Sequence, residues 1–261
     1  MGNSAFGGNV SSESSAVQSV DRALTILKVL SERGESGVTE IATELGIHKS
    51  TASRLLSSLV DHELVEQVTE RGKFRLGVGI LRLAGGVSAN LEPVAGSRAV
   101  TRLLAQEIEE SVNICVLDGS DALYVDQVIG PNLSATKSWV GTRLPAHASA
   151  TGKALTAWLD EDARKAARPK KWIKLMPRTI MSADDLEKEL ALTRKRGYAL
   201  AVEEYEPGLV GIAAPIRDAH GEVVATVAVS GPGHRITPDR YQDIARQVMD
   251  AALKLSGKAD Y

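Results

Sequence analysis

Apolar residues recur at helical spacing in two neighbouring segments of the N-terminal third of the chain. In residues 39–46 they are Ile41, Ala42 and Leu45, and in residues 48–62 they are Ala52, Leu55, Leu56 and Leu59. The hydroxyl of Thr39 is placed to cap the first segment, and Gly46 can end it because glycine tolerates a positive φ. The pattern predicts two short amphipathic helices joined by a tight turn.

The polar face of the second predicted helix carries short hydroxyl side chains and two cations. An exposed helix face usually favours strong helix formers instead. Short side chains would let a helix lie close to DNA in the major groove, where Arg and Lys reach guanine edges or phosphates. The candidate DNA-contacting residues of the two helices are Thr39, His48, Lys49, Ser50, Thr51, Ser53 and Arg54.

Two strand-like segments, residues 65–68 and 73–76, follow these helices and predict a hairpin, or wing. Arg71 and Lys73 are candidate contacts to a phosphate backbone. Residues 19–77 hold eight lysines and arginines against nine acidic residues, so the segment is not basic overall, although its cations gather on the second helix and the wing. A winged helix-turn-helix is the favoured interpretation, and the alternative is a solvated helix pair in any helical domain.

Two further helices are expected around this motif. Residues 19–33 have an apolar stripe (Val20, Ala23, Leu24, Leu27 and Leu30), a capping serine at position 19 and a closing Gly34. Residues 77–90 form an apolar linking helix whose exposed surface predicts pairing with a second copy of the chain. The expected organisation is a disordered tail at 1–16, a DNA-binding domain at 17–77, a linker helix at 78–91 and a second domain at 92–257.

From residue 111 the apolar pattern changes to that of strands and turns. The expected strands are residues 112–117, 122–129, 210–216 and 222–230, arranged as two hairpins. The expected helices are one opened by Pro93, one at residues 151–158, one capped by Ser182 and ending at Gly197, and one running from 237 to 256. Long helices beside two β segments predict an α+β domain with an antiparallel sheet flanked by helices.

Composition narrows the functional classes. The net charge of the 261-residue chain is −2, which argues against a generic polyanion binder, and its single cysteine, Cys115, excludes an intrachain disulfide and is expected to be buried. No apolar run approaches the ~20 residues of a membrane span, and the first residues are not those of a secretory signal, so the cytoplasm is the expected location.

Motifs for catalysis, metal or cofactor binding are not found. The Ala150-Thr151-Gly152-Lys153 segment lacks the remaining residues of a phosphate-binding P-loop, and the five histidines have no zinc-ligand spacing. The carboxylates of Glu203, Glu204 and Glu206 are expected to lie in a solvated loop or to cap nearby N–H groups. We therefore predict neither an enzyme nor a cofactor.

Three parts of the chain together resemble the IclR family of bacterial transcriptional regulators. They are the helix-turn-helix with its wing, the segment LPAHASATGKALTAWL at 144–159, and the segment EEYEPGLVGIAAPIRDAHGEVVATVAVSGPGHRIT at 203–237. The resemblance implies a winged helix-turn-helix, a linking helix and a GAF-like effector-binding domain. It also implies a homodimer or a dimer of dimers that responds to a small metabolite.

The resemblance implies an effector pocket between the sheet and the loops that face it. The matching positions are Leu133, Leu144, Ala150, Thr151, Gly152, Ala201, Gly211, Ala228 and Ser230. Some relatives have an acidic residue, a cysteine and a serine at positions 201, 211 and 228, whereas this chain has smaller or apolar groups. That difference favours a larger, more apolar effector, and the alternative is that the small residues simply pack the sheet.

The expected function is a repressor of a catabolic operon that binds a pseudo-palindromic DNA operator. The expected effector is a small carboxylic acid, aromatic in the sharpest form of the hypothesis, whose anionic end meets free N–H groups at Ala150, Thr151 and Gly152. The alternative is a small-molecule-binding or catalytic GAF-like protein whose N-terminal helices serve only dimerisation.

Overall fold

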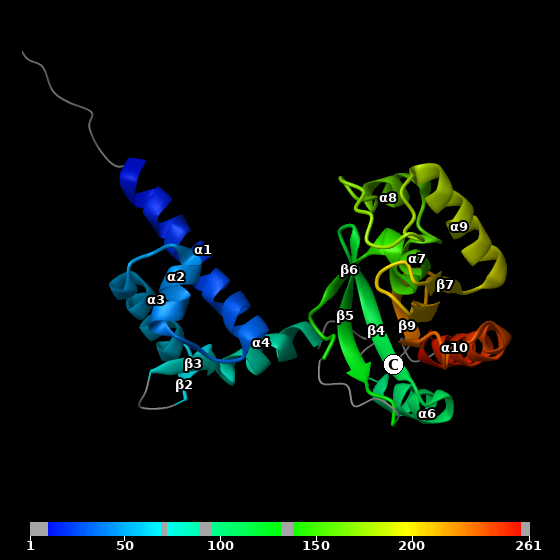
Figure 1. Ribbon diagram of the computed structural model, residues 1–261, viewed down its shortest axis with the longest axis horizontal. Helices are drawn as coiled ribbons and strands as arrows, with labels where there is room; N and C mark the ends of the chain where they lie inside the picture. The colour runs from blue at the N-terminus through cyan, green and yellow to red at the C-terminus, as the bar shows by residue number, and fades with distance from the viewer. Residues whose placement is uncertain (1–9, 69–71, 89–95, 132–137, 257–261) are drawn as a thin grey trace, which may run out of the picture. The chain divides into compact units, whose positions relative to one another are not determined.

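The computed structural model describes residues 10–68, 72–88, 96–131 and 138–256 (Figure 1). The chain forms two compact units, residues 1–90 and residues 91–261, and each is considered by itself. The N-terminal unit is a winged helix-turn-helix and the C-terminal unit is an antiparallel sheet flanked by helices, so the predicted α+β class is confirmed.

The N-terminal unit packs three helices against a small sheet. The helices are α1 (Val10–Arg33), α2 (Val38–Leu45) and α3 (Lys49–Asp61), and the strands β1 (Ser36–Gly37), β2 (Val65–Gln67) and β3 (Lys73–Leu76) lie in the order β1-β3-β2. The core comprises Ile26, Leu30, Ile41, Ala42, Ala52, Leu56, Leu59 and Val65. The apolar stripe predicted for α3 therefore faces this core, and Gly46 ends α2 with φ 62° as predicted.

Two predicted helix starts are wrong. α1 begins at Val10, so Ser19 lies inside it and residues 10–16 are helical rather than a tail; no glycine or proline stands between residues 10 and 19 to stop the helix. α2 is capped by Gly37, whose backbone N–H donates to Glu40 Oε2 at 2.7 Å, because the glutamate reaches back over the first turn. Thr39 therefore lies within α2.

The linking helix α4 (Gly79–Ser88) follows the wing directly. A Cβ atom at Gly77 or Gly79 would overlap the carbonyl of Glu63, so the chain can leave the wing at this point only with glycine. Leu81 and Leu83 are 75% and 62% exposed, as expected for a helix with an unpartnered apolar surface.

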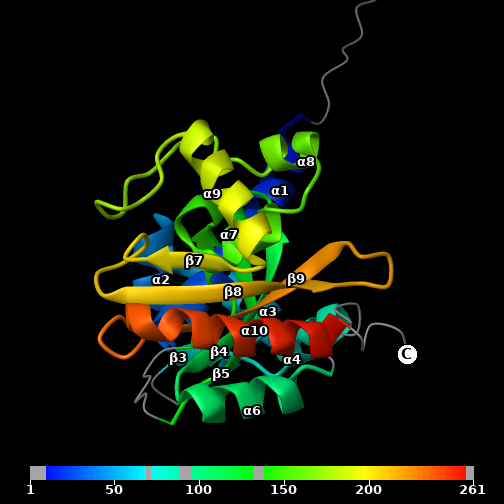
Figure 2. The ribbon, with the colours of Figure 1, turned by 90° about the vertical axis from the view of Figure 1, so that its right-hand side faces the viewer.

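The C-terminal unit contains a six-stranded antiparallel sheet (Figures 1 and 2). Its strands are β4 (Ser111–Asp118), β5 (Asp121–Val128), β6 (Arg143–Pro145), β7 (Ala199–Val202), β8 (Leu209–Arg217) and β9 (Val223–Pro232), in the order β6-β5-β4-β9-β8-β7. The β4–β5 and β8–β9 hairpins are those that the sequence predicts, whereas β6 and β7 were not predicted.

The two faces of this sheet are covered differently. α6 (Arg98–Ile108) and α10 (Tyr241–Ser256) cover one face, and α7 (Ala150–Thr156) and α9 (Ala183–Arg196) lie on the other, with α8 (Glu161–Ala166) nearby (Figure 2). Aliphatic side chains fill the α6/α10 side, whereas the α7 side is an alanine cluster at positions 150, 154, 199, 201, 213 and 228. These small side chains let α7 approach the sheet closely.

Three predicted helices of this unit are observed, namely α7, α9 and α10. α9 is capped by the hydroxyl of Ser182 and ends at Gly197, and the final helix follows a 3₁₀ turn at Pro238–Arg240. Pro93, the predicted start of the first helix, lies outside the described residues. Within the described ranges, every helix is too short or too polar to cross a bilayer.

Candidate DNA-binding surface and effector pocket

The polar face of α3 is exposed, as the sequence predicts. His48, Lys49, Ser50, Ser53 and Arg54 are exposed and Thr51 is half-buried. In the described part of the chain, the cations of Lys49 and Arg54 make no ion pair. A polyanion can therefore approach both without displacing a carboxylate of the described residues.

Thr39, Lys49 and Lys73 border one groove of about 370 Å³ between the starts of α2 and α3 and the wing. Arg71 lies outside the described residues. Arg75, on the same strand as Lys73, pairs with Glu66 and is less available to a phosphate. The folding of the wing thus brings cations from two elements to one side of the helix-turn-helix.

The C-terminal unit has two adjacent chambers on the α7 side of its sheet, which share lining residues. The outer chamber encloses about 280 Å³ and the inner recess about 30 Å³, and Tyr124, Leu144, Leu209 and Ser230 border both. The inner volume is large enough to hold a water molecule. The recess thus fits one polar group, and the outer chamber fits a larger body.

Seven of the nine predicted effector residues border the recess. They are Leu144, Ala150, Thr151, Ala201, Gly211, Ala228 and Ser230. The sheet register explains this convergence: Ala228 pairs with Ala213 and Asn113, and Ser230 pairs with Gly211 and Ser111, so alternate residues share one face. The alanines also form the packing cluster under α7, as the alternative interpretation of the small residues expected.

The other two predicted residues do not join this set. Leu133 lies outside the described residues. Gly152 does not border the recess. It packs against the backbone of Ala146 instead, so closely that a Cβ atom on Gly152 would overlap Ala146. Its N–H is not free, because Ser149 Oγ accepts it at 3.1 Å as the cap of α7. The prediction of a free N–H group at Gly152 is wrong because the preceding serine caps the helix.

Aromatic side chains that the sequence analysis missed line the pocket. The ring of Trp139 lies 6.0 Å from that of Tyr124 and 6.3 Å from that of Tyr205. Aromatic residues are only 4% of the chain, so their gathering at one cavity is notable. No sequence spacing joins these residues, which come from β5 and two loops.

Hydroxyl groups supply the donors of the pocket. Burial raises the pKa of Tyr124 well above its ordinary value, so its hydroxyl stays protonated. Ser230 Oγ accepts from Asn113 Nδ2 at 3.0 Å, which leaves the Ser230 hydrogen to donate. Thr151 donates to Ser149 Oγ at 3.3 Å, so its hydrogen is already engaged.

A buried ion pair stands behind the recess. Lys153 on α7 is 1% exposed, and its Nζ lies 2.6 Å from Glu204 Oε1 and 3.0 Å from the carbonyl oxygen of Leu200. Glu204 itself borders the recess. The expectation of a solvated loop is therefore wrong for Glu204, because a buried ammonium requires a counter-charge.

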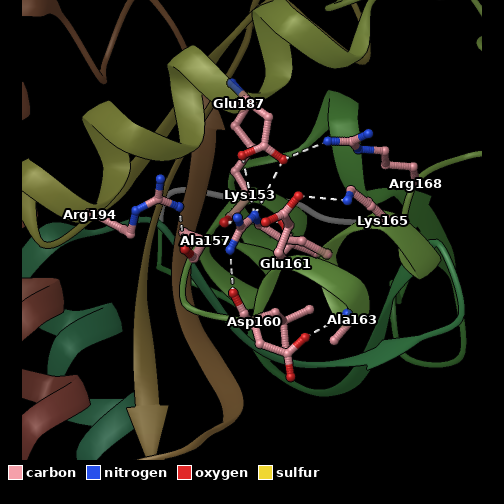
Figure 3. A network of polar contacts seen from close by, with 12 residues as sticks. Lys153, Ala157, Asp160, Glu161, Ala163, Lys165, Arg168, Glu187 and Arg194 are labelled. Carbon is pink, nitrogen blue, oxygen red and sulfur yellow. Dashed lines mark hydrogen bonds and ion pairs between the residues drawn. The ribbon is translucent and has the colours of Figure 1, made fainter.

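Polar contacts also fix the helices around α7 (Figure 3). Arg194 of α9 donates to the carbonyl of Ala157 at 2.6 Å, just after α7 ends, and Arg168 pairs with Glu187 of α9 at 2.9 Å. Asp160 caps α8 by accepting from the Ala163 N–H at 2.8 Å. These contacts hold the helical layer that positions the recess.

Comparison with known proteins matches both units to one family. Residues 19–69 match the IclR helix-turn-helix domain, and residues 88–257 match the bacterial transcriptional regulator IclR C-terminal domain. The chain belongs to the IclR family of transcriptional regulators. An IclR-family protein binds DNA through the first domain and a small-molecule effector through the second, and this chain is accordingly a regulator and not an enzyme.

Individual relatives agree with this assignment. The chain is 35% identical to the transcriptional repressor IclR of Escherichia coli K12, with 92% of this chain and 89% of that protein covered. It is 32% identical to the regulator XynR of the same organism, with 94% and 98% covered. The structure of an IclR homologue from Microbacterium hydrocarbonoxydans, complexed with 4-hydroxybenzoate, has the same fold: the TM-score is 0.80, the identity 24%, and the coverage 93% of this chain and 98% of that one.

Proposed function

We propose that this IclR-family protein represses a catabolic operon in the cytoplasm by binding a pseudo-palindromic operator. The exposed polar face of α3 enters the major groove, with Lys49, Ser50, Thr51 and Arg54 at the bases or phosphates and Lys73 at the flanking backbone. Two of its relatives are repressors, namely the transcriptional repressor IclR of E. coli and the acetate operon repressor of Salmonella typhimurium, and they support repression rather than activation.

We further propose that the effector is a small aromatic carboxylic acid bound in the two adjacent chambers. The observation that carries this proposal is the aromatic wall of Tyr124, Trp139 and Tyr205. The outer chamber of about 280 Å³ is near the lower end of small-molecule sites, ~300–1,000 Å³, which suits a single ring. The homologue complexed with 4-hydroxybenzoate supports the same class of molecule.

The acid group is assigned to the hydroxyls of Tyr124 and Ser230, which border both chambers. α7 contributes less than the sequence suggested, because Ser149 occupies the Gly152 N–H. Effector binding favours one arrangement of the dimer over another and so changes the spacing of the two DNA-binding domains. It can do so only through unequal affinity for the two arrangements.

Thermal-shift measurements on the full-length protein test the effector. A ligand that binds only the native state at 100 times its Kd stabilises it by ≈ 2.7 kcal/mol, so benzoates should raise the melting temperature and the neutral benzamide should do so far less. Equal shifts with benzoate and benzamide would mean that the acid group is not recognised.

Two substitutions test where the effector binds. Ala228→Asp fills the recess and adds a negative charge, and should abolish binding, whereas Ala228→Ser is the matched folding control. Ser50→Ala, on α3, should leave effector affinity nearly unchanged and weaken DNA binding. An Ala228→Asp protein that is folded and binds benzoates as tightly as wild type would show that the pocket is placed wrongly.

A further inference from the structure

One buried carboxylate oxygen of a residue in the recess wall is left without a hydrogen bond. Glu204 Oε1 is occupied by Lys153 at 2.6 Å, but Glu204 Oε2 is buried and has no hydrogen-bond partner among the described residues. Glu204 also belongs to the wall of the recess. A buried acceptor without a donor is costly, and a carboxylate more so than a neutral group.

Lys153 favours the ionised form of this carboxylate. Burial raises the pKa of Glu204, and the adjacent ammonium opposes that shift. The Lys153 Nζ has its own fixed partners, since it also donates to the Leu200 carbonyl at 3.0 Å and lies 3.9 Å from Glu189. The pair is thus anchored to β7 and α9, and Oε2 is the carboxylate oxygen that remains for a ligand.

The size of the recess limits what can meet this oxygen. A volume of about 30 Å³ accepts a small polar group such as a hydroxyl or amino group, and a carboxylate placed there would be repelled by Glu204. We propose that Glu204 Oε2 selects effectors that carry a hydrogen-bond donor, a hydroxyl or amino group, on the end that enters the inner recess. This inference rests on the proposed aromatic acid effector and assigns its orientation: donor group inward, ring in the outer chamber, acid group toward Tyr124 and Ser230.

Calorimetric titration of the full-length protein with three matched ligand types tests the proposal. They are benzoate, the three hydroxybenzoates and the three methoxybenzoates, because a methoxy group retains the acceptor but removes the donor. One hydroxybenzoate isomer should bind at least tenfold more tightly than benzoate and than its own methoxy counterpart. Equal affinities for the three types would overturn the proposal without affecting the proposed effector class.

The substitution Glu204→Gln tests directly whether Glu204 causes the preference for a hydroxyl group. Lys153 requires an oxygen on its side, so the amide NH₂ must take the position of Oε2 and present a donor to the recess. The hydroxyl preference should disappear, and the methoxy ligand should gain relative to the hydroxy ligand. Glu203→Gln, the same change one residue away and outside the wall, should keep the wild-type preference. A folded Glu204→Gln protein with that preference intact would contradict the assignment.

Two neutral ligands, phenol and anisole, distinguish a failure of the proposed acid effector from a failure of the proposed role of Glu204. If no benzoate binds but phenol binds at least tenfold more tightly than anisole, the acid effector is wrong and the role of Glu204 stands. If neither series binds, both proposals are overturned. Should Glu204→Gln fail to fold, the wild-type hydroxy-to-methoxy ratio still decides the role of Glu204.

Discussion

His147 is a buried histidine whose protonation opposes folding. Its ring lies 5.2 Å from that of Trp172, and burial lowers its pKa. It stands two residues before Ser149, the cap of α7, so its charge state bears on the helix that forms the recess. As pH falls below the ordinary histidine pKa of 6.5, the unfolded chain binds a proton that the folded protein does not.

We therefore expect the free energy of unfolding to fall on acidification from pH 7.5 to 5.5. The His147 contribution has a slope of at most ~1.4 kcal/mol per pH unit, and His147→Gln should remove it. Urea unfolding at several pH values measures the slope. His220→Gln, at an exposed histidine in the β8–β9 turn, is the control and should leave the slope unchanged. Parallel slopes in wild type and His147→Gln would exclude the assignment.

At single residues the sequence predicted the walls of the recess better than its polar chemistry. Ala201, Ala228 and Ser230 were predicted from the resemblance to the IclR family. Lys153 was not, because a lysine on a short helix is ordinarily exposed. Its burial depends on the Leu200 carbonyl and Glu204, which lie 47 and 51 residues further along the chain. Long-range pairing of that kind leaves no local signal.

Helix α3 makes a prediction at the scale of one element. Arg54 lies on its exposed face, opposite the buried Ala52, Leu56 and Leu59. If Arg54 reads a base, Arg54→Ala should cost ~1–3 kcal/mol of operator affinity and relax specificity at one base position. If Lys73 contacts a phosphate, Lys73→Ala should weaken binding to all DNA sequences alike. It should also lower the slope of the logarithm of the binding constant against the logarithm of salt concentration by about 1. Fluorescence anisotropy at several salt concentrations measures both.

The control for these variants is Lys28→Ala on α1, which removes an exposed cation outside the proposed DNA-binding face. Its operator affinity should match that of wild type. Operator affinity that is unchanged in folded Arg54→Ala and Lys49→Ala proteins would argue against α3 as the recognition helix.

The elements that were predicted well are those specified by nearby residues. α9 has a serine cap and a terminal glycine, and the β4–β5 and β8–β9 hairpins have short turns between alternating strands. β6 and β7 are only three and four residues long, too short to show a period, and they form because neighbouring strands offer an edge. The first helix was predicted to be shorter than α1 because Ser19, which lies inside the helix, was interpreted as its N-cap.

At the scale of the whole molecule, exposed apolar surface on the N-terminal unit predicts self-association. On α1, Val17, Val20 and Leu24 follow one helix face and are 70%, 60% and 53% exposed, although Val20 and Leu24 belong to the apolar stripe that was predicted for this helix. On α4, Leu81 and Leu83 are exposed as well. Apolar side chains that are exposed along a helix face mark a candidate interaction site.

We predict that these helices pair with those of a second copy and set two recognition helices ~34 Å apart, one turn of DNA. Sedimentation at micromolar concentration should show a dimer or a larger assembly, and the operator should be a pseudo-palindrome. The double substitution Leu81→Asp with Leu83→Asp places charges in the interface and should shift the protein toward monomer and weaken operator binding. Ile173→Asp, the same kind of change at a half-exposed position in the C-terminal unit, should do neither. A wild-type monomer at micromolar concentration would defeat this prediction, because a single helix-turn-helix with no excess positive charge has too few phosphate contacts for tight operator binding.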